Sequence, residues 1–301
     1  MVIDNISDFC LKYTLESGQS FRWSRIDDSY YGVVNGKILR LQQKTTSALI
    51  IESSCIEDER VFTEFLFHYL DLNRDLASIL NAVRVDGYIA KAIEHFWGMR
   101  VLNQELWETI ASFILSQNNN IKRIRNLIRT LAEKFGEKIE FNGYIDYTFP
   151  TPKALAEAGI EEIFSCGTGY RARYLWGAAA KITKKELLLD KLKRLTYTEA
   201  KKELMNLEGV GEKVADCICL FSLGHLEALP IDVWIKRIFE RIYLQKKTSV
   251  TEIRQFAYDY FGEYIGYAQQ YLFHYAQNND NWAAPEKLAL KDINIVNYDK
   301  M

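Results

Sequence analysis

Apolar and polar residues alternate over much of residues 1–50, as they do in strands that bury one face of a sheet. Asn35-Gly36 stands between two apolar runs, and Asn-Gly in such a place is a strong signal for a β-hairpin. The pattern therefore predicts an antiparallel sheet near the start of the chain, with strands in four short runs: 21–26, 30–35, 37–43 and 47–53.

The apolar period changes to that of helices from residue 57 to about residue 290. The segment EDERVFTEFLFHYLDL is the first predicted helix. The other predicted helices span 74–82, 87–97, 104–117, 119–135, 152–158, 160–165, 169–185, 197–206, 211–223, 232–242, 250–260 and 264–278. A loop is predicted after Phe141-Asn142-Gly143. The fold class is therefore predicted as α+β, an antiparallel sheet with helices followed by a large all-α domain.

Domain boundaries are placed from this change of pattern. The sheet and its helices form the predicted domain 1–100, and the helical part forms the domain 101–285. Residues 286–301 are predicted to be a loosely attached tail.

The composition is that of a globular protein with a substantial core, with 48% hydrophobic and 13% aromatic residues among 301. No apolar run is long enough to cross a bilayer, and the first residues lack the plan of a signal peptide. We therefore expect an intracellular monomer with no membrane partner. The five cysteines are scattered, without the spacing of a zinc or iron–sulfur site, so we expect free thiols and no metal or organic cofactor.

The net charge of −2 and the pI of about 6.2 argue against a nucleic-acid partner when they are taken for the whole chain. Residues 121–194, however, hold 15 Lys and Arg against 9 Asp and Glu. A local basic face of this kind can attract a polyanion, although an ordinary solvated face explains the charge equally well.

The most informative segment is LEGVGEKVADCICLFSLGHLEALPID, residues 207–232. Gly209 and Gly211 allow a tight turn before a helix, whose free amides suit a phosphate. Lys213 lies in an otherwise apolar run, and a desolvated lysine becomes a nucleophilic amine. Asp232 follows nineteen positions later. The alternative, a plain helix–helix connection with a snorkelling lysine, stays open from this segment alone.

Four further segments carry candidate contacts to a nucleic acid. They are SGQSFRW at 17–23, QNNNIKRI at 117–124, GTGYRARY at 167–174 and GYAQQYLF at 266–273. In the last of these, Gln269 and Phe273 share one helix face and could hold the edge and the face of a flat polar ring. A helix junction, an amphipathic helix and an aromatic core stripe are the structural alternatives.

Taken in order, these motifs resemble those of 8-oxoguanine DNA glycosylases, within the helix-hairpin-helix/Gly-Pro-Asp DNA glycosylase superfamily. The resemblance runs from about residue 13 to residue 276. It implies an N-terminal domain similar to the TATA-binding protein, and a partner in double-stranded DNA that contains 8-oxoguanine opposite cytosine. The implied activity is base release through a lysine Schiff base, followed by β-elimination.

The resemblance also implies roles for individual residues. Lys213 falls on the catalytic lysine and Asp232 on the catalytic aspartate. The base would be held by the Gly18 carbonyl at its N7 hydrogen, by Gln269 at its Watson–Crick edge, and between Cys217 and Phe273.

The remaining implied roles concern the DNA. Asn118 would fill the gap left by the extruded base, Tyr170 would wedge the stack, and Arg123 with Arg171 would read the opposite cytosine. The hairpin with Gly209, Gly211 and Val214 would grip the DNA backbone, where the family often binds a monovalent cation.

Two positions depart from the family pattern. Trp234 stands where family members commonly have a phosphate-contacting histidine, and Glu208 replaces the proline often found before Gly-Val-Gly. The rival interpretations are a monofunctional alkylbase glycosylase, which needs no lysine amine, and a DNA-binding module without catalysis. An iron–sulfur relative of the endonuclease III kind is disfavoured by the scattered cysteines.

Overall fold

The computed structural model of the chain describes residues 1–279, so the predicted tail at 286–301 and the predicted domain end at 285 lie outside the described residues. An antiparallel five-stranded sheet comes first, with the strand order β1-β5-β4-β3-β2. Its strands are β1 (Val2–Ile3), β2 (Ser24–Ile26), β3 (Ser29–Val34), β4 (Lys37–Thr45) and β5 (Ala48–Ser53). The predicted sheet is confirmed.

The turn between β3 and β4 shows why the sequence signal is reliable there. Asn35 and Gly36 have φ values of 48° and 72°, which only a few residue types adopt readily. These angles match a hairpin turn whose twist fits the twist of the strands. In β4 and β5, Leu39, Leu41 and Ile51 are fully buried and form a core with α1 (Leu11–Glu16) and α2 (Glu59–Tyr69).

The rest of the described chain is mainly helical. Its longer helices are α3 (Leu76–Val83), α4 (Gly87–His95), α5 (Leu106–Leu115), α6 (Ile121–Phe135), α7 (Pro152–Ile163), α8 (Arg171–Thr183), α10 (Tyr197–Leu204), α11 (Glu212–Phe221), α12 (Val233–Ile238), α13 (Val250–Phe261) and α14 (Ile265–Asn278). Short helical turns are α9 (Leu189–Leu192), η1 (Phe164–Thr168), η2 (Phe239–Tyr243) and η3 (Gly262–Tyr264).

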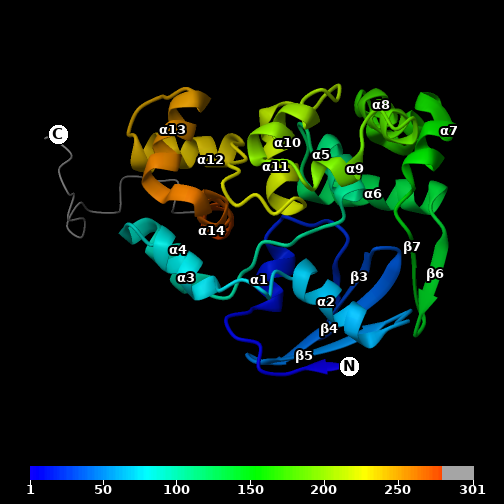
Figure 1. The fold of residues 1–301 in the computed structure, drawn as a ribbon, viewed down its shortest axis with the longest axis horizontal. Helices are drawn as coiled ribbons and strands as arrows, with labels where there is room; N and C mark the ends of the chain where they lie inside the picture. The colour runs from blue at the N-terminus through cyan, green and yellow to red at the C-terminus, as the bar shows by residue number, and fades with distance from the viewer. Residues whose placement is uncertain (280–301) are drawn as a thin grey trace, which may run out of the picture.

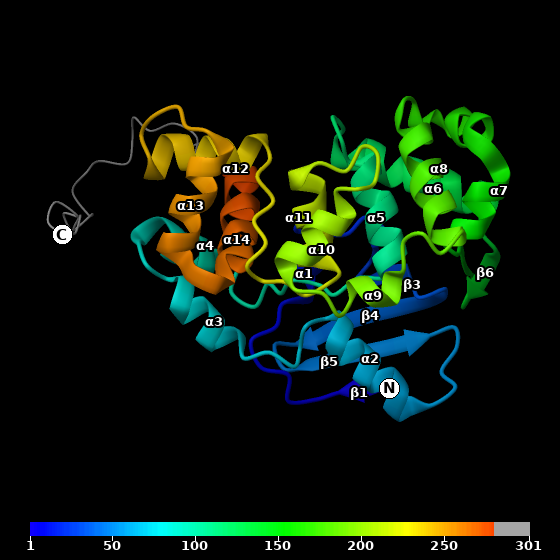
Figure 2. The ribbon, with the colours of Figure 1, turned by 45° about the horizontal axis from the view of Figure 1, so that its top comes forward.

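These helices form two groups that lie side by side above the sheet (Figures 1 and 2). One group contains α3, α4, α12, α13 and α14, and the other contains α5 to α11. A single hydrophobic core extends through both groups. Although α3 and α4 precede residue 100, they pack on α14 near the end of the described chain.

Two local predictions were wrong. A loop was expected after Phe141-Asn142-Gly143, but the chain there continues as β7 (Tyr144–Tyr147), which pairs with β6 (Lys138–Phe141) in a hairpin. Its turn, Asn142-Gly143, again has two positive φ values, 49° and 79°. The strands have only four residues each, which is too short for the alternation to stand out.

The first predicted strand was too long, because residues 21–23 do not join the sheet. Phe21 belongs to the helical core, whereas Trp23 belongs to the core of the sheet. Trp23 also donates a hydrogen bond from Nε1 to the Tyr69 hydroxyl, at 2.8 Å. The chain therefore passes from one core to the other at this point.

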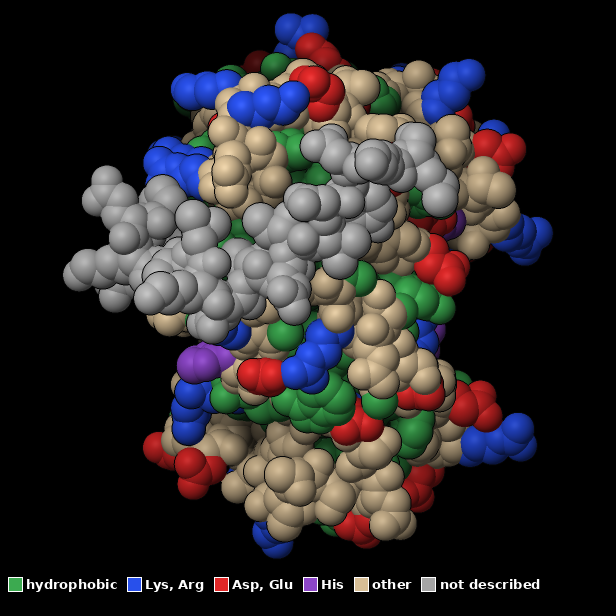
Figure 3. Space-filling model, turned by 90° about the vertical axis from the view of Figure 1, so that its left-hand side faces the viewer, with side chains coloured by type: hydrophobic (Ala, Val, Ile, Leu, Met, Phe, Trp, Pro, Cys, Tyr) green, Lys and Arg blue, Asp and Glu red, His purple; other side chains and the backbone are tan. Residues whose placement is uncertain are grey.

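The kink in α7 agrees with the two helices predicted at 152–158 and 160–165. Gly159 has φ 81° and ψ 170°, which interrupts the helix. No helix within residues 1–279 is both long and apolar enough to span a membrane. The end of the molecule that faces the viewer in Figure 3 carries basic and acidic side chains side by side, so charge alone does not select this end as a DNA surface.

Candidate active site

A cavity of about 1040 Å³ opens between the two helix groups. Its walls come from the loop after α1, from α5 and the turn that follows it, and from α6, α11, α12 and α14. Nine of the residues implied by the resemblance line it: Gly18, Asn118, Gly211, Lys213, Val214, Cys217, Asp232, Gln269 and Phe273. The other four, Gly209, Arg123, Tyr170 and Arg171, are not among its lining residues.

The turn between α10 and α11 needs glycine at one position but not at the other. Gly209 has φ +80°, and a Cβ there would overlap the ring of Tyr174. Gly211 has φ −89°, and a Cβ there would meet no atom within 4 Å. Nothing within the described chain therefore requires a glycine at 211, and the open space in front of it is available to a ligand.

Gly211 is also the N-cap of α11 and provides no side-chain cap. The amides of Glu212, Lys213 and Val214 form no hydrogen bond within the described residues. Free amides at the start of a helix favour an anion, both by donating hydrogen bonds and through the helix dipole.

Lys213 lies in the first turn of α11 and extends along the cavity wall. Its Nζ atom lies 5.4 Å from the centre of the Phe113 ring, at cation–π distance. One turn further on, the thiol of Cys217 is 2% exposed, and burial raises its pKa to about 11. The lysine amine thus lies beside an aromatic ring and a neutral thiol, and within the described residues it forms no ion pair with a carboxylate.

Asp232 is the N-cap of α12, and its Oδ1 accepts a hydrogen bond from the Ile235 amide at 2.8 Å. Burial raises the pKa of Asp232, while the Ile235 amide and the positive charge of Lys213 act in the opposite direction. The capping bond fixes the carboxylate at the cavity wall, in the electrostatic field of Lys213.

The opposite wall contains a polar group without a protein partner. The Gln269 side chain is 4% exposed, and its Oε1 forms no hydrogen bond within the described chain. Burying an amide oxygen in this way is unfavourable unless something else satisfies it. Because Gln269 lines the cavity, a ligand that donates a hydrogen bond there would remove this penalty.

Gly18 faces Phe273 across the same part of the cavity. Gly18 has φ +79°, and a Cβ on it would come within 3.5 Å of Phe273 Cε1 and 3.2 Å of Ile121 Cδ1. Its carbonyl oxygen accepts no hydrogen bond from the described residues. Gly18, Gln269 and Phe273 therefore provide an acceptor, an amide and an aromatic face in one place.

The residues implied in DNA opening lie at the edge of the cavity, on the turn after α5 and at the start of α8. Asn118 has φ 45° and donates from Nδ2 to the Tyr170 hydroxyl at 3.2 Å. Tyr170 is 51% exposed, as a wedge would need to be. Arg123 is exposed on the first turn of α6.

Arg171 was expected to have a guanidinium group free to contact a base, and in the structure this group is already bonded to the protein. It is 4% exposed and donates to the carbonyl oxygens of Gln117 and Asn118, the latter at 3.1 Å. Its guanidinium also lies 4.5 Å from the centre of the Tyr170 ring. To read a cytosine, Arg171 would have to exchange these bonds, so its reading role stays a prediction.

The structure shows the neighbours of Glu208 and Trp234, the two residues that depart from the family pattern. Glu208 is paired with Arg173, with 2.8 Å between Oε1 and Nη2 and 3.1 Å between Oε2 and Nε. The two-point pair links the hairpin to α8, close to Tyr170. Trp234 lines the cavity and is 39% exposed, so it offers an aromatic surface where a histidine would offer a hydrogen bond.

Some cavity residues had no recognisable signal in the sequence. Phe113 lies in an apolar helix, where its contact with Lys213 cannot be told from core packing. Lys122 and Lys236 also line the cavity and add positive charge near Lys213. Lys122 is the second residue after the asparagine run, and this closeness is the one hint the sequence contained.

Comparison with known proteins agrees with this geometry. Residues 1–110 match the family model for the 8-oxoguanine DNA glycosylase N-terminal domain, and residues 111–261 match that for HhH-GPD superfamily base excision DNA repair proteins. The N-glycosylase/DNA lyase of Saccharomyces cerevisiae is 31% identical over 319 residues, which cover 89% of this chain and 84% of the yeast protein.

Two solved structures are similar over most of the chain. MBOgg1 in complex with a low-affinity DNA ligand has a TM-score of 0.88 and 42% identity, covering 92% of this chain and 95% of its own. The Clostridium acetobutylicum 8-oxoguanine glycosylase/lyase, in complex with double-stranded DNA containing cytosine opposite 8-oxoguanine, has a TM-score of 0.87 and 36% identity, with the same coverage. The chain belongs to the HhH-GPD superfamily of base excision DNA repair proteins and, within it, to the 8-oxoguanine DNA glycosylase family.

Proposed function

We propose that the protein is a DNA N-glycosylase and AP lyase that removes 8-oxoguanine opposite cytosine from duplex DNA. The observation that carries the proposal is the meeting of three groups in one cavity: the Lys213 amine, the partly buried Asp232 carboxylate and the unpartnered Gln269 oxygen. An amine and a carboxylate can break a glycosidic bond, and an unpartnered amide can read the edge of a base.

The target base must leave the duplex before it can react, because the stack hides its C1′ atom. The neutral amine of Lys213 attacks C1′, and the C1′–N9 bond breaks with its electron pair leaving on the base, which takes up a proton. The sugar ring opens to give a Schiff base between Lys213 and C1′. Loss of a proton from C2′ then expels the 3′ phosphate by β-elimination.

Asp232 has an electrostatic role in this sequence. Positive charge develops on the sugar as the base leaves, and a fixed carboxylate at that point stabilises it without reorganisation. The Ile235 amide holds the carboxylate in place. The Phe113 ring and the buried Cys217 thiol lie beside the Lys213 amine and line the same cavity.

The cavity wall that contains Gly18, Gln269 and Phe273 would recognise the base. The Gly18 carbonyl would accept the N7 hydrogen, which 8-oxoguanine has and guanine lacks. Gln269 would bind the Watson–Crick edge, and Phe273 and Cys217 would cover the two faces. The free Gly18 oxygen, the unpartnered Gln269 oxygen and the buried thiol all support this assignment.

Contacts to the rest of the DNA are assigned to the edge of the cavity. Asn118 would occupy the gap in the stack, and Tyr170 would wedge beside it. The hairpin, with Gly209, Gly211 and Val214, would hold a phosphate on the free amides of α11. Arg123 and Arg171 would read the cytosine, with Arg171 changing its present carbonyl partners. Such an enzyme acts in association with DNA.

Cleavage of five duplexes tests the proposal. Four carry 8-oxoguanine opposite each of the four bases, and the fifth carries an alkylated purine. We expect strand cleavage without added alkali, fastest with cytosine opposite the lesion. Release of the alkylated purine alone, with strand breaks only after alkali, would support the monofunctional rival. Binding to all five duplexes without any base release would indicate a DNA-binding module.

A further inference from the structure

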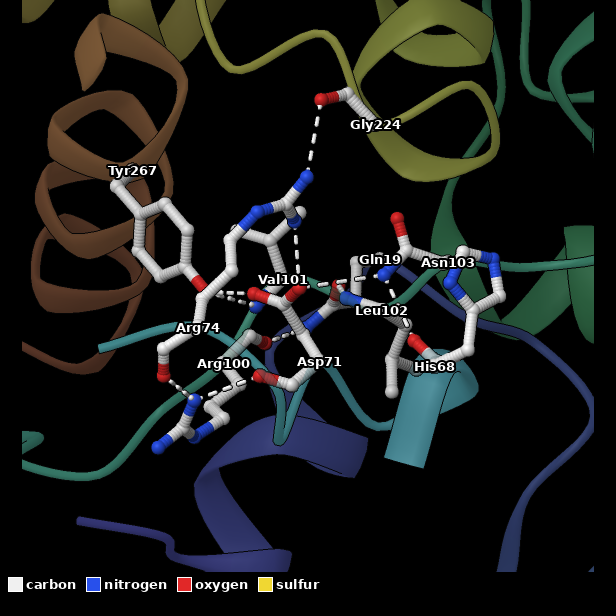
Figure 4. A network of polar contacts seen from close by, with 10 residues as sticks. All are labelled: Gln19, His68, Asp71, Arg74, Arg100, Val101, Leu102, Asn103, Gly224 and Tyr267. Carbon is white, nitrogen blue, oxygen red and sulfur yellow. Dashed lines mark hydrogen bonds and ion pairs between the residues drawn. The ribbon is translucent and has the colours of Figure 1, made fainter. Parts of the chain in front are cut away.

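A buried polar network lies beside the base-binding part of the cavity and contains none of the residues assigned to catalysis (Figure 4). Its centre is Asp71, which is 3% exposed and lies in the turn between α2 and α3. The Tyr267 hydroxyl on α14 donates to Asp71 Oδ2 and accepts a hydrogen bond from the Val101 amide at 3.3 Å. Arg100 Nη1 donates to the Asp71 carbonyl at 2.6 Å. Asp71 thus ties α14 to the segment 100–102.

The same segment holds the loop that contains Gly18. The amide group of Gln19 is 1% exposed, and its Nε2 donates to the Arg100 carbonyl at 2.8 Å. Its Oε1 accepts from the Leu102 amide at 2.7 Å, and its Nε2 also donates to the Thr14 carbonyl at 2.9 Å. Both ends of this side chain are therefore committed to the protein.

A hydrogen bond also joins α14 directly to the loop that contains Gly18. Gln270, on α14, donates from Nε2 to the Ser17 carbonyl at 2.9 Å. Gly18 is consequently anchored on both sides, through Ser17 to α14 and through Gln19 to the segment 100–102. Gln269 directly precedes Gln270 on α14, so each of the two groups that would face the base is next in the chain to a residue of this hydrogen-bond network.

We propose that Tyr267, Asp71 and Gln19 are positioning residues that set the separation between the Gly18 carbonyl and the Gln269 amide, and so determine how tightly the cavity holds an oxidised purine. This inference rests on the proposed function. A hydrogen bond weakens steeply outside a narrow range of distance and angle, and a fully satisfied buried network is rigid. Removing one member loosens the hold on α14 and the Gly18 loop, whereas the contact of Lys213 with Phe113 and the bond of Asp232 to the Ile235 amide are not part of this network.

Tyr267→Phe tests the inference because it deletes one hydroxyl and keeps the ring. The matched control is Tyr271→Phe, since Tyr271 is equally buried on the same helix and donates to the Met99 carbonyl at 2.8 Å, without a bond to Asp71 or Gln19. Two single-turnover rates are measured for each protein. One is excision of 8-oxoguanine opposite cytosine, and the other is β-elimination at a preformed abasic site, which has no base to bind.

We expect Tyr267→Phe to lower the ratio of excision to elimination roughly tenfold, the equivalent of one typical hydrogen bond, and Tyr271→Phe to leave it within about twofold. Gln19→Met should repeat the result and serves if Tyr267→Phe does not fold. An equal fall of both rates, an unchanged ratio, or the same loss in Tyr271→Phe would overturn the inference. Wild-type protein inactive on both substrates would instead overturn the proposed function, and the inference with it.

Discussion

Replacing Gly211 with alanine should separate DNA binding from folding. The backbone at this position, φ −89° and ψ −179°, suits any residue, and an added Cβ meets no atom within 4 Å. Alanine restricts the unfolded chain and so stabilises by about 0.4–1 kcal/mol. It is also a poorer N-cap than glycine, by up to about 1 kcal/mol. The two effects nearly cancel, so we expect the melting temperature to stay within about 3 °C of wild type.

DNA affinity should respond differently to Gly211→Ala. The methyl group would stand in front of the free amides of α11, where a phosphate is proposed to approach. Losing one hydrogen bond to a charged group typically corresponds to about 1.5–3 kcal/mol, which is roughly a 10- to 100-fold weaker affinity. The assay is fluorescence anisotropy at fixed salt with an 8-oxoguanine:cytosine duplex, in a Lys213→Gln background so that no cleavage occurs.

Gly209→Ala is the matched control for this experiment. Alanine at φ +80° costs about 1–2 kcal/mol, and its methyl group would overlap the Tyr174 ring, at a further cost of about 1–3 kcal/mol. We expect a clearly lower melting temperature for this variant only. Two results would refute the reasoning: a loss of more than about 5 °C for Gly211→Ala, or unchanged affinity in that variant.

Three further predictions concern charge and burial. Glu208→Gln should change the free energy of unfolding by less than about 1 kcal/mol, because the ion pair of Glu208 with Arg173 is exposed. The same change should tighten duplex binding at low salt, because it removes a negative charge from the hairpin. Unchanged affinity would argue against a phosphate at the hairpin. Burial raises the pKa of Glu108 to about 7, so the folded state holds this proton more tightly than the unfolded state does. The free energy of unfolding should therefore fall as the pH rises from about 5 to about 7. Glu108→Gln should remove on the order of 2 kcal/mol of that fall in denaturant titrations, whereas an identical pH dependence in both proteins would disprove it. The Cys217 thiol, with its pKa raised to about 11 by burial, should resist alkylation at pH 8 until the protein unfolds, and rapid labelling seen by mass spectrometry would contradict its burial.

Sequence patterns predicted the sheet and most helices because those signals are local. Asn35-Gly36 marked a hairpin by its turn chemistry, and apolar periodicity marked the long helices. The hairpin at the same dipeptide, Asn142-Gly143, was not predicted, since the flanking strands are short and contain no fully buried residue. Residues 21–23 were misassigned because their side chains enter two different cores, which no local pattern shows.

The site was predictable where chemistry follows from residue type, and not where it follows from distant contacts. Lys213 and Asp232 could be singled out from one segment, and they do line one cavity. The link between Asp71 and Tyr267 joins residues 196 positions apart, so nothing in the sequence indicates it. The burial of Arg171 was equally hidden, because its acceptors are backbone carbonyls of a turn more than fifty residues away.

Borohydride trapping on a duplex with 8-oxoguanine opposite cytosine tests the central claim most directly. Reduction of a Schiff base would join protein and DNA covalently, and peptide mapping would identify the attached residue. We expect the adduct on Lys213, its loss in Lys213→Gln, and its retention in Lys236→Gln, which removes another cavity lysine. No adduct in the wild-type protein, or an adduct that persists in Lys213→Gln, would contradict the account.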